Sequence, residues 1–515
     1  MTPLPTPLLG LLLALLAGVA HTFSFAPYEF PAVQLVALAA LIALVQQQPS
    51  WRWAALTGFA FGLGWFCTGV SWVYISMHDH GDMPFAIAAP ATVALASYLS
   101  LYPALAAGVA YRVTHRPGLR LLLAWPGAWA LSEWLRGTLL TGLPWIASGY
   151  AHTEGPLAGF APVLGAYGLC LLAAAVAGAV VMLVQPLSQL ALTARGWALG
   201  IVLVVIGSGL VLQRIEWTHP MGAPIKVKLA QGNIPQDLKF GQGGTELAAQ
   251  RYSALLPDPP GVHADLAVLP ESAFGVPLLD LPPDARDGLL TFAQRHNTAL
   301  VFGIFLEEPR GHYFNSALGV QGKEEPQQYR KRHLVPFGEY IPVGFRWFVD
   351  LMKMPIGDQD HGASYQPPMQ LAGQRIAVNI CFEDLFGAEI IHAWRDPALE
   401  PTLLLNLSNL AWFNDSIALP QHLQISRMRA LETGRPMLRA TNTGATAIID
   451  PHGRVTAQLP FNLIATLRGE VTGYQGRTPY VSCGDIPALV LAALMLAAAV
   501  VAQIKAGRSQ SAVSA

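Results

Sequence analysis

Cys381 differs from the other cysteines of the chain because it ends an apolar, largely β-branched run, Ile376-Ala-Val-Asn-Ile380, and precedes two carboxylates, Glu383 and Asp384. The run predicts a buried strand, and Asp384 can cap a helix that follows it. A cysteine where a strand meets a turn is a candidate nucleophile for covalent catalysis. Taken alone, such a residue is more often a small buried thiol of the core. The rest of the sequence has to decide between these two interpretations.

Two further charged residues follow predicted strands elsewhere in the chain. Glu271 comes directly after Leu266-Ala-Val-Leu269, and Lys331 lies in a polar stretch that begins at Tyr329. Taken singly, Glu271 is more often a surface carboxylate and Lys331 a solvated charge. Because catalytic residues of α/β domains gather at the carboxyl ends of strands, we expect both to lie near Cys381. Together the three provide a general base, a cation for an oxyanion and a nucleophile, which is the minimum for acyl transfer.

Short strands that alternate with helices begin at Ile225. The predicted strands are 225–231, 264–269, 299–305, 314–320, 375–380, 402–407, 437–442, 445–450 and 463–471. The predicted helices lie near 244–256, 283–297, 384–395 and 418–433. This alternation predicts an α/β domain whose helices cover its sheets, and the segment is long enough for one domain with its own core.

The composition indicates that much of the chain lies outside water. Charged residues make up 12% of the 515 residues and hydrophobic residues 53%, and the mean hydropathy is +0.40. Soluble proteins carry about 25% charged residues, so a membrane location is predicted. The net charge of −1 argues against a nucleic-acid partner. Segments of spanning length, eight in all, lie near 6–24, 30–48, 53–75, 85–111, 120–135, 159–184, 194–213 and 485–504.

Basic residues are concentrated in alternate connections between these segments, namely Arg52, Arg112, Arg116, Arg120, Arg195, Lys505 and Arg508. By the positive-inside rule both termini are cytoplasmic, and the long segment after the seventh span is extracytoplasmic. The first segment has no basic region before it and further spans follow, so we interpret it as a retained helix. We therefore divide the chain into a membrane domain of seven spans (1–214), an extracytoplasmic catalytic domain (215–480), and a last span with a cytoplasmic tail (481–515).

Three other stretches each have two interpretations. His78-Asp79-His80 is a solvated loop or part of a metal site, and two histidines without a further ligand favour the loop. Arg136 and Trp145 either anchor the chain at the membrane interface or receive a lipid headgroup. The apolar run that contains Trp347 and Phe348 is a core helix or a mobile arm that touches the bilayer, and we favour the arm.

The order Glu271, Lys331, Cys381 resembles the Glu-Lys-Cys triad of the nitrilase, or carbon–nitrogen hydrolase, superfamily, whose fold is an αββα sandwich. The chain is most similar to the membrane-bound branch of that superfamily, the apolipoprotein N-acyltransferases. The motifs that carry the resemblance are Gln231-Gly-Asn-Ile-Pro-Gln236, Pro270-Glu271, His333-Leu-Val-Pro-Phe-Gly-Glu-Tyr-Ile-Pro342, Cys381-Phe-Glu383 and Ser408-Asn-Leu-Ala-Trp-Phe413. The resemblance covers nearly the whole chain. It implies an α-helical membrane bundle of eight spans joined to an α/β nitrilase-like αββα sandwich.

The resemblance also implies a two-step reaction. Glu271 is the general base, Lys331 stabilises the oxyanion and Cys381 is the nucleophile, while the backbone N–H of Phe382 is the second oxyanion donor. An acyl chain from a phospholipid, phosphatidylethanolamine in the family, forms a thioester on Cys381. The chain then passes to the α-amino group of the diacylglyceryl-cysteine of an apolipoprotein, so that the kinetics are ping-pong. No cofactor or metal is implied, and the location is the bacterial inner membrane with the catalytic domain in the periplasm.

Further residues receive supporting roles from the same resemblance. Glu339 is similar to an additional active-site glutamate and is expected to position Lys331 or the incoming amine. Glu383 either orients the nucleophile loop or caps the next helix. Phe240 occupies a position where tryptophan is expected in some members, and Phe382 one where tyrosine also occurs, so no hydroxyl role is assigned at 382. The residues expected to face lipid are Arg136, Trp145, Phe240, Trp347, Phe348 and Trp412.

There are two alternatives to this function. A membrane-tethered amidase that hydrolyses soluble amides or nitriles shares the triad but needs no access to lipid. A transporter with a ligand-binding domain is disfavoured, because the predicted spans have no charged residues at mid-helix and no evident inverted repeat. We expect an acyltransferase.

Overall fold

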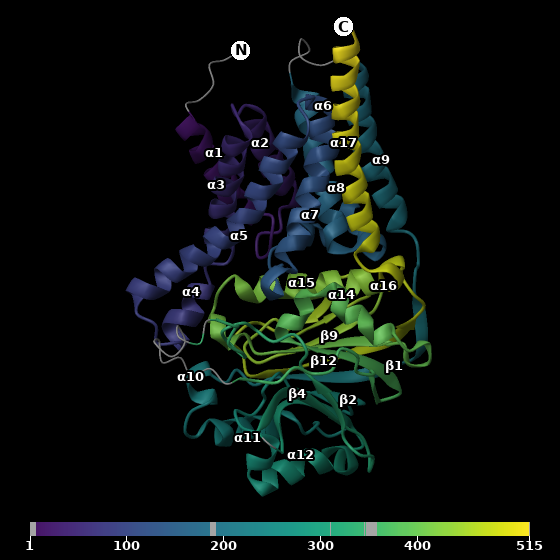
Figure 1. Ribbon diagram of the computed structural model, residues 1–515. Helices are drawn as coiled ribbons and strands as arrows, with labels where there is room; N and C mark the ends of the chain where they lie inside the picture. The colour runs from purple at the N-terminus through teal and green to yellow at the C-terminus, as the bar shows by residue number, and fades with distance from the viewer. Residues whose placement is uncertain (1–6, 186–191, 310, 345, 347–357, 514–515) are drawn as a thin grey trace. The chain divides into compact units, whose positions relative to one another are not determined.

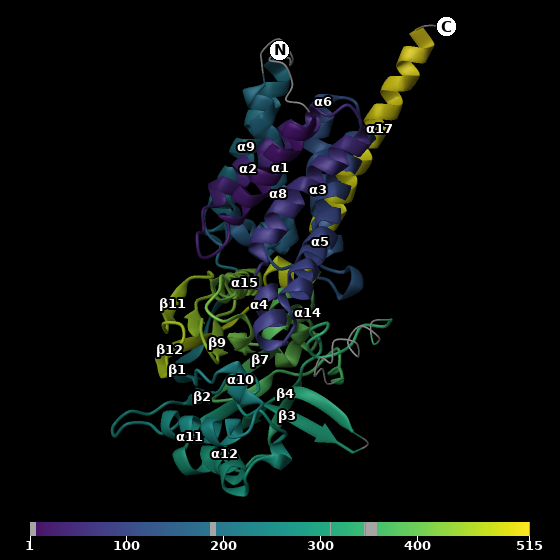
Figure 2. The ribbon, with the colours of Figure 1, turned by 90° about the vertical axis from the view of Figure 1, so that its left-hand side faces the viewer.

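A computed structural model describes residues 7–185, 192–309, 311–344, 346 and 358–513 of the protein. The chain forms two compact units, whose elements are labelled in Figures 1 and 2. The first unit comprises Met1–Ser71, Ala86–Glu216 and Ser482–Ala515, and the second comprises Trp72–Phe85 and Trp217–Val481. The short segment Trp72–Phe85 thus belongs to the second unit, although the chain on both sides of it belongs to the first.

The first unit is built from apolar helices. They are α1 (Pro7–Thr22), α2 (Pro31–Gln46), α3 (Trp51–Gly69), α5 (Phe85–Val113), α6 (Pro117–Leu119), the π-helical turn η2 (Arg120–Ala124), α7 (Trp125–Arg136), α8 (Ala161–Val184), α9 (Leu192–Leu212) and α17 (Ile486–Val513). Long side chains such as Leu8, Leu203 and Leu494 are exposed on their outer faces. Exposed apolar faces on helices of this length are typical of contact with lipid rather than water.

Helix length supports fewer spans than the eight predicted. Among the described residues, the helices long and apolar enough to cross a membrane are Phe85–Val113, Pro156–Val184, Leu192–Leu212 and Ile486–Ala506. The bent pair Trp51–Gly69 and Trp72–His80 adds a fifth if the two form one span. Helices α1 and α2 have 16 residues each and α7 has 12, which is below the ~20 residues that a spanning helix needs.

The second unit contains two six-stranded sheets. The first has the order β12-β1-β2-β3-β4-β5 and the second β11-β10-β9-β8-β7-β6. The strands of the first are β1 (His219–Gln231), β2 (Leu266–Val268), β3 (Ala299–Glu308), β4 (His312–Val320), β5 (Gln327–Arg330) and β12 (Ala465–Gln475). Those of the second are β6 (Met369–Leu371), β7 (Gln374–Ile380), β8 (Leu403–Ser408), β9 (Met437–Thr441), β10 (Ala447–Ile449) and β11 (Val455–Gln458). The central strands β1-β2-β3 and β7-β8-β9 are parallel, and the outer pairs are antiparallel.

The two sheets pack face to face and helices cover their outer faces. Alternate residues of both sheets, such as Val301 and Leu405, form one buried cluster. The other face of the first sheet packs against α11 (Gly244–Leu255) and α12 (Pro283–His296), and that of the second packs against α15 (Ala418–Thr433). Figures 1 and 2 show these four layers in sequence. Burial of both faces explains the almost continuously apolar central strands, and the predicted αββα sandwich is confirmed.

Differences from the predicted elements lie at the sheet edges and after the nucleophile. The strands β5, β6 and β11 were not predicted, and each is the edge strand of its sheet. The helix predicted over 384–395 is replaced by short turns, namely η8 (Cys381–Leu385), α14 (Gly387–Ile390) and η9 (Ile391–Trp394). The carboxylate of Asp384 is buried beside Arg439 and accepts from Ser426, so the first turn folds into the interior instead of starting an exposed helix.

The face between the sheets should govern the stability of the second unit. Replacing Leu405, which is fully buried in it, with Ala should leave a cavity and destabilise the unit by about 2–5 kcal/mol. The measurement is the thermal unfolding midpoint of the purified full chain. The control is Leu279→Ala, because Leu279 is 68% exposed and its loss should leave the midpoint nearly unchanged. Equal midpoints for the two variants would contradict the assignment of this core.

Candidate active site

The nucleophile candidate occupies a strained turn. Cys381 follows the last residue of β7 and begins η8, and its φ is +52°. The left-handed region costs a non-glycine residue roughly 1–2 kcal/mol. Such strain persists only where the surrounding structure imposes it, and it is concentrated at functional sites. The turn lets Ile380 remain in the core between the sheets, while Cys381 lies just beyond the carboxyl end of β7.

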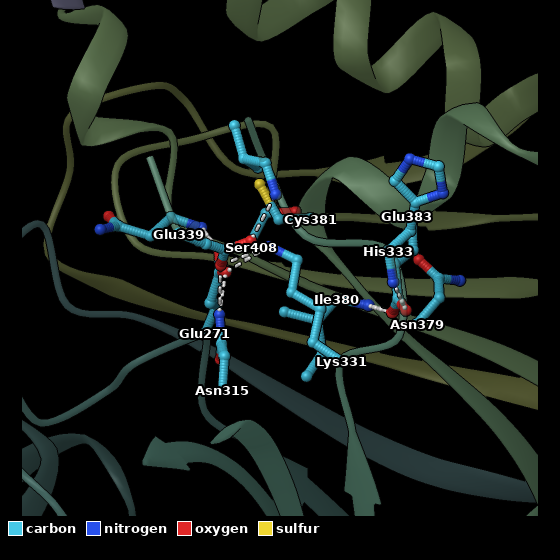
Figure 3. A network of polar contacts seen from close by, with 12 residues as sticks. Glu271, Asn315, Lys331, His333, Glu339, Asn379, Ile380, Cys381, Glu383 and Ser408 are labelled. Atoms are coloured by element: carbon cyan, nitrogen blue, oxygen red, sulfur yellow. Dashed lines mark hydrogen bonds and ion pairs between the residues drawn. The ribbon is translucent and has the colours of Figure 1, made fainter. Parts of the chain in front are cut away.

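A buried ammonium lies between two carboxylates beside this turn. The Nζ of Lys331 is 2.8 Å from Oε1 of Glu339 and 3.3 Å from Oε1 of Glu271. The side-chain Nδ2 of Asn315 donates to the same two oxygens, at 2.8 Å to Glu271 and 2.9 Å to Glu339. Lys331 follows β5, Asn315 lies on β4 and Glu271 follows β2, so the first sheet supplies these three. Figure 3 shows Glu271, Lys331 and Glu339 converging near Cys381.

The second sheet fixes the other oxygen of the general-base candidate. The backbone N–H of Asn409, directly after β8, donates to Oε2 of Glu271 at 2.7 Å. Glu271 is 5% exposed, and both of its oxygens have hydrogen-bond donors. The carboxylate is therefore oriented from both sheets at once, which limits its motion relative to Cys381.

Charge determines the resting protonation of the two reactive groups. Burial raises the pKa of the Cys381 thiol and the carboxylate of Glu271 adds to this, while Lys331 opposes both. For Lys331, burial alone would lower the pKa, but Glu339 and Glu271 raise it above its ordinary value. The thiol is consequently neutral at rest and the lysine is charged. Such a thiol needs a base to become a nucleophile, and a carboxylate is present in the same cluster.

Glu383 connects the nucleophile turn to the segment that carries Lys331. Its carboxylate accepts from the backbone N–H of Ile380 at 2.7 Å and of Arg332 at 2.7 Å. It also accepts from the N–H of His333 at 3.1 Å and from the hydroxyl of Tyr329 at 2.9 Å. The bond to Ile380 is consistent with a cap of the following turn, and the remaining bonds are consistent with orientation of the loop. Figure 3 shows part of this network, and the capping and loop-orienting roles of Glu383 both stay predictions.

A second polar layer supports the backbone of the nucleophile. Arg439 donates to Nδ1 of His422, so the proton of the neutral ring lies on Nε2, which donates to the carbonyl oxygen of Cys381 at 3.1 Å. Burial lowers the pKa of His422 well below its ordinary value, and Arg439 lowers it further. Asn406 also donates to the Cys381 carbonyl, at 3.4 Å. The strained peptide of Cys381 is therefore held from β8, β9 and α15.

The segment Trp72–Phe85 contacts two segments that flank the site. The ring of His80 has Nδ1 2.9 Å from a carboxylate oxygen of Asp237 and Nε2 3.0 Å from Oδ1 of Asn414. Asn414 in turn donates to Asp79 at 3.0 Å. The group His78-Asp79-His80 therefore joins α10 (Gln236–Lys239) to the turn after η11 (Leu410–Phe413). Within the described part of the chain, no group of three or more His, Cys, Asp or Glu residues is arranged to hold a metal ion.

Two aromatic rings lie on the segments that His80 joins. Phe240 and Trp412 are 48% and 37% exposed, and their ring centroids are 6.4 Å apart in a stacked arrangement. Exposed neighbouring aromatic rings close to a catalytic cluster are suited to contact an apolar substrate.

Of the other residues predicted to face lipid, Arg136 and Trp145 lie in the first unit. Both are buried, at 1% and 3% exposure. The guanidinium of Arg136 pairs with Glu133 at 2.9 Å and donates to the carbonyl oxygen of Trp145 at 3.1 Å. Through these bonds Arg136 stabilises the turn that follows α7. Trp347 and Phe348 lie outside the described residues.

The comparisons with known proteins agree along the length of the chain. Residues 17–179 match the family model of the apolipoprotein N-acyltransferase N-terminal domain, and residues 232–477 match that of carbon-nitrogen hydrolase. Among solved structures, the C. elegans NitFhit protein covers 50% of this chain and 62% of its own, with a TM-score of 0.38 and 19% identity. The apolipoprotein N-acyltransferase of Ralstonia nicotianae is 48% identical, over 96% of this chain and 94% of its own. Those of Bordetella bronchiseptica and Chromobacterium violaceum are 42% and 43% identical over 94% and 95% of this chain, and over 95% and 94% of their own.

The chain belongs to the apolipoprotein N-acyltransferase family. The resemblance drawn from the sequence motifs is therefore confirmed. Membership of this family supports N-acylation of lipoproteins over amide hydrolysis or transport as the activity.

Several residues of this candidate site were not predicted from the sequence. They are Asn315, Asn409, His422 and Arg439. The available signals were a single amide, Asn315, in the buried part of strand β4 and an arginine, Arg439, in the buried strand β9. Both residues are buried, and a polar side chain in a buried strand requires specific partners.

The hydrogen bonds of Asn315 should matter for catalysis, because its amide holds Glu271 and Glu339 together. Replacing Asn315 with Ala leaves two buried carboxylate oxygens with one donor fewer each, a loss of about 1–3 kcal/mol. We expect N-acylation of a lipopeptide acceptor to fall by about tenfold or more. The control is Gln250→Ala on the exposed face of α11, which should retain the activity of the unaltered chain. An unchanged rate for Asn315→Ala would refute this role.

Proposed function

We propose that the protein transfers a fatty acyl chain from a phospholipid, through a thioester on Cys381, to the α-amino group of the diacylglyceryl-cysteine of apolipoproteins. The observation that carries the proposal is the buried cluster of Glu271, Lys331 and Glu339 beside the strained Cys381. These groups supply a base, a cation and a nucleophile within a chain of the apolipoprotein N-acyltransferase family.

In the first step Glu271 takes the Sγ proton of Cys381, and the sulfur attacks the ester carbonyl carbon of the phospholipid. The negative charge that develops on the carbonyl oxygen is stabilised by the ammonium of Lys331 and by the backbone N–H of Phe382. When the tetrahedral intermediate collapses, the carbon–oxygen bond of the ester breaks. The departing alkoxide takes the proton from Glu271, which releases a lysophospholipid and leaves the thioester.

In the second step the neutral α-amine of the acceptor attacks the thioester carbonyl, and Glu271 accepts a proton from the nitrogen. The same two donors stabilise the oxyanion. The carbon–sulfur bond then breaks, an amide forms, and Glu271 returns its proton to the departing sulfur. The enzyme is thus acylated in the first half-reaction and restored in the second, so the kinetics are ping-pong.

Glu339 positions the oxyanion-stabilising lysine in this scheme. Besides Lys331 and Asn315, its carboxylate accepts from the backbone N–H of Val335 at 2.8 Å. The carboxylate of Glu339 therefore has three hydrogen-bond donors. This supports a role in positioning Lys331 rather than the incoming amine.

For the membrane, we propose eight spans with both termini in the cytoplasm of the bacterium. Residues 117–136 are helical throughout, as α6, η2 and α7 in succession, which supports one span there. Helices α1 and α2 are the two short spans. Domain 1–214 then lies in the inner membrane. Domain 215–480 lies in the periplasm and is catalytic, and segment 481–515 is a last span followed by a cytoplasmic tail.

Both substrates carry acyl chains, so apolar side chains are needed beside the triad. Phe240 and Trp412 are suited to this by their exposure and stacking. We propose that Trp347 and Phe348 contact the bilayer, and that Arg136 and Trp145 act at the membrane boundary. The acyl donor in this proposal is phosphatidylethanolamine.

Intact mass measurement tests the central chemistry. Incubation of the full chain with phosphatidylethanolamine should add the mass of one acyl chain, labile to hydroxylamine and mapped to Cys381. Cys381→Ala should show no such gain, because the accepting sulfur is absent. The matched control is Cys483→Ala, which removes a different, exposed free cysteine and should still be acylated. Acylation that persists in Cys381→Ala would disprove the assignment of the nucleophile.

A further inference from the structure

Lys239 is a buried lysine beside the active site that the proposed mechanism does not use. It is the last residue of α10 and is 1% exposed. Its Nζ donates to the backbone carbonyl oxygen of Glu271 at 3.1 Å. The ammonium is therefore hydrogen-bonded to the main chain of the residue whose side chain is the proposed general base.

The backbone around Lys239 leaves its position little freedom. Its N–H donates to the carbonyl oxygen of Pro235 at 3.0 Å. A Cβ built on Gly275 would lie only 2.0 Å from the carbonyl oxygen of Lys239, so the two main chains are in contact and only glycine fits there. The lysine is consequently placed by backbone packing and not by an ion pair.

The partners of Lys239 differ from those of the other buried lysines. Lys228 pairs with Asp258 at 2.7 Å, and Lys331 pairs with Glu339 and Glu271. Within the described residues, Lys239 has no carboxylate oxygen in ion-pair range and one carbonyl oxygen as its hydrogen-bond partner. A buried charge without a paired counter-charge is costly, so a purely structural role would favour an apolar residue at this position.

The charges of the site give this ammonium a function. Glu271 and Glu339 carry two negative charges, and Lys331 carries one positive charge. The excess of one negative charge persists when the Cys381 proton moves to Glu271, and it persists in the oxyanion intermediate. A charged Lys239 offsets this excess close to where the negative charge develops.

We propose that Lys239 is a positioning residue for acyl transfer, which holds the backbone of Glu271 and favours the thiolate of Cys381 through its positive charge. The inference deepens the proposed function and rests on it for the identity of the reaction. Its effect on the thiol itself requires no phospholipid.

The charge of Lys239 depends on pH. Burial lowers its pKa to about 7, although Glu271 and Cys381 oppose the shift. The lysine is therefore charged below about pH 7 and neutral well above it. The groups that face it are Glu271 and Cys381, with Lys331 and Glu339 next to them. Its support for the thiolate is present at low pH and is lost as the pH rises through 7.

The test is the rate at which iodoacetamide alkylates Cys381 in the full chain, followed by peptide mass at pH 6 to 9. Lys239→Met should slow alkylation by about tenfold at pH 6 and by less than about twofold at pH 9, where the lysine is already neutral. Lys239→Arg keeps the charge at every pH, so it should match the unaltered chain at pH 6 and exceed it at pH 9. Lys228→Met is the matched control, since it removes a buried lysine of the same unit that pairs with Asp258. It should leave the alkylation profile unchanged.

Two outcomes would overturn the inference. One is a profile of Lys239→Met that superimposes on that of the unaltered chain while the unfolding midpoint falls, which indicates a structural role alone. The other is a slowing of the same size at every pH. If Lys239→Met does not fold, Lys239→Arg decides, because a profile identical to the unaltered chain at pH 9 would also overturn the inference. Failure of the acyl-enzyme to form, together with a Lys239-dependent profile, would refute the proposed function and leave this inference intact.

Discussion

The burial of Lys331 between two carboxylates is the interaction on which the candidate site depends. Two negative charges so close together repel, and neither is stable in the interior without a cation between them. Removal of one partner from a buried charge pair costs about 3–5 kcal/mol, because the remaining charge stays unpaired in a low dielectric. Loss of any one of the three charged groups is therefore expected to destabilise the other two. This gives the site a single geometry before any substrate is present, which is the condition under which fixed charges stabilise a transition state most effectively.

The sandwich fold makes this cluster possible by joining residues that are distant in sequence. Glu271 follows β2, Lys331 follows β5 and Cys381 follows β7, and the strands are held by a core shared between the two sheets. The first sheet carries the candidate base and the cation, whereas the second carries the candidate nucleophile. The hydrogen bond from the Asn409 N–H to the Glu271 carboxylate connects the candidate base to the second sheet. Any shift of one sheet across the other would separate the base from the thiol, so dense packing between the sheets also serves the chemistry.

The sequence alone was sufficient for the central strands and for helices α11, α12 and α15, because these have strong local signals. The triad was predicted from the same kind of signal, and its catalytic role stays a prediction. Strands buried on both faces are apolar runs, and Cys381, Glu271 and Lys331 follow such runs or lie in a polar loop with a specific motif. The edge strands β5, β6 and β11 were missed because an edge strand is buried on one side only. Polar and apolar residues are therefore mixed in it, as in Gln327–Arg330. The supporting residues Asn315 and Arg439 were missed because a buried polar residue is identified by its partners, and those partners come from other strands. By length alone, the described helices support four or five of the eight predicted spans, because composition does not reveal where a helix ends or bends.

The segment Trp72–Phe85 adds a constraint that neither sheet provides. Its ends continue into helices α3 and α5 of the first unit, yet Trp72 donates to Gln421 on α15 at 3.1 Å and His80 bonds to Asp237 and Asn414. The contacts of His80 involve the segments that carry Phe240 and Trp412, whereas the contact of Trp72 is with α15. A change in the path of this segment would therefore reach both the exposed aromatic rings and the turn of Cys381, because His422 follows Gln421 on α15 and bonds to the carbonyl oxygen of Cys381. Because α10 also carries Lys239, which donates to the main chain of Glu271, the exposed aromatic rings and the candidate triad are supported by the same elements of the second unit.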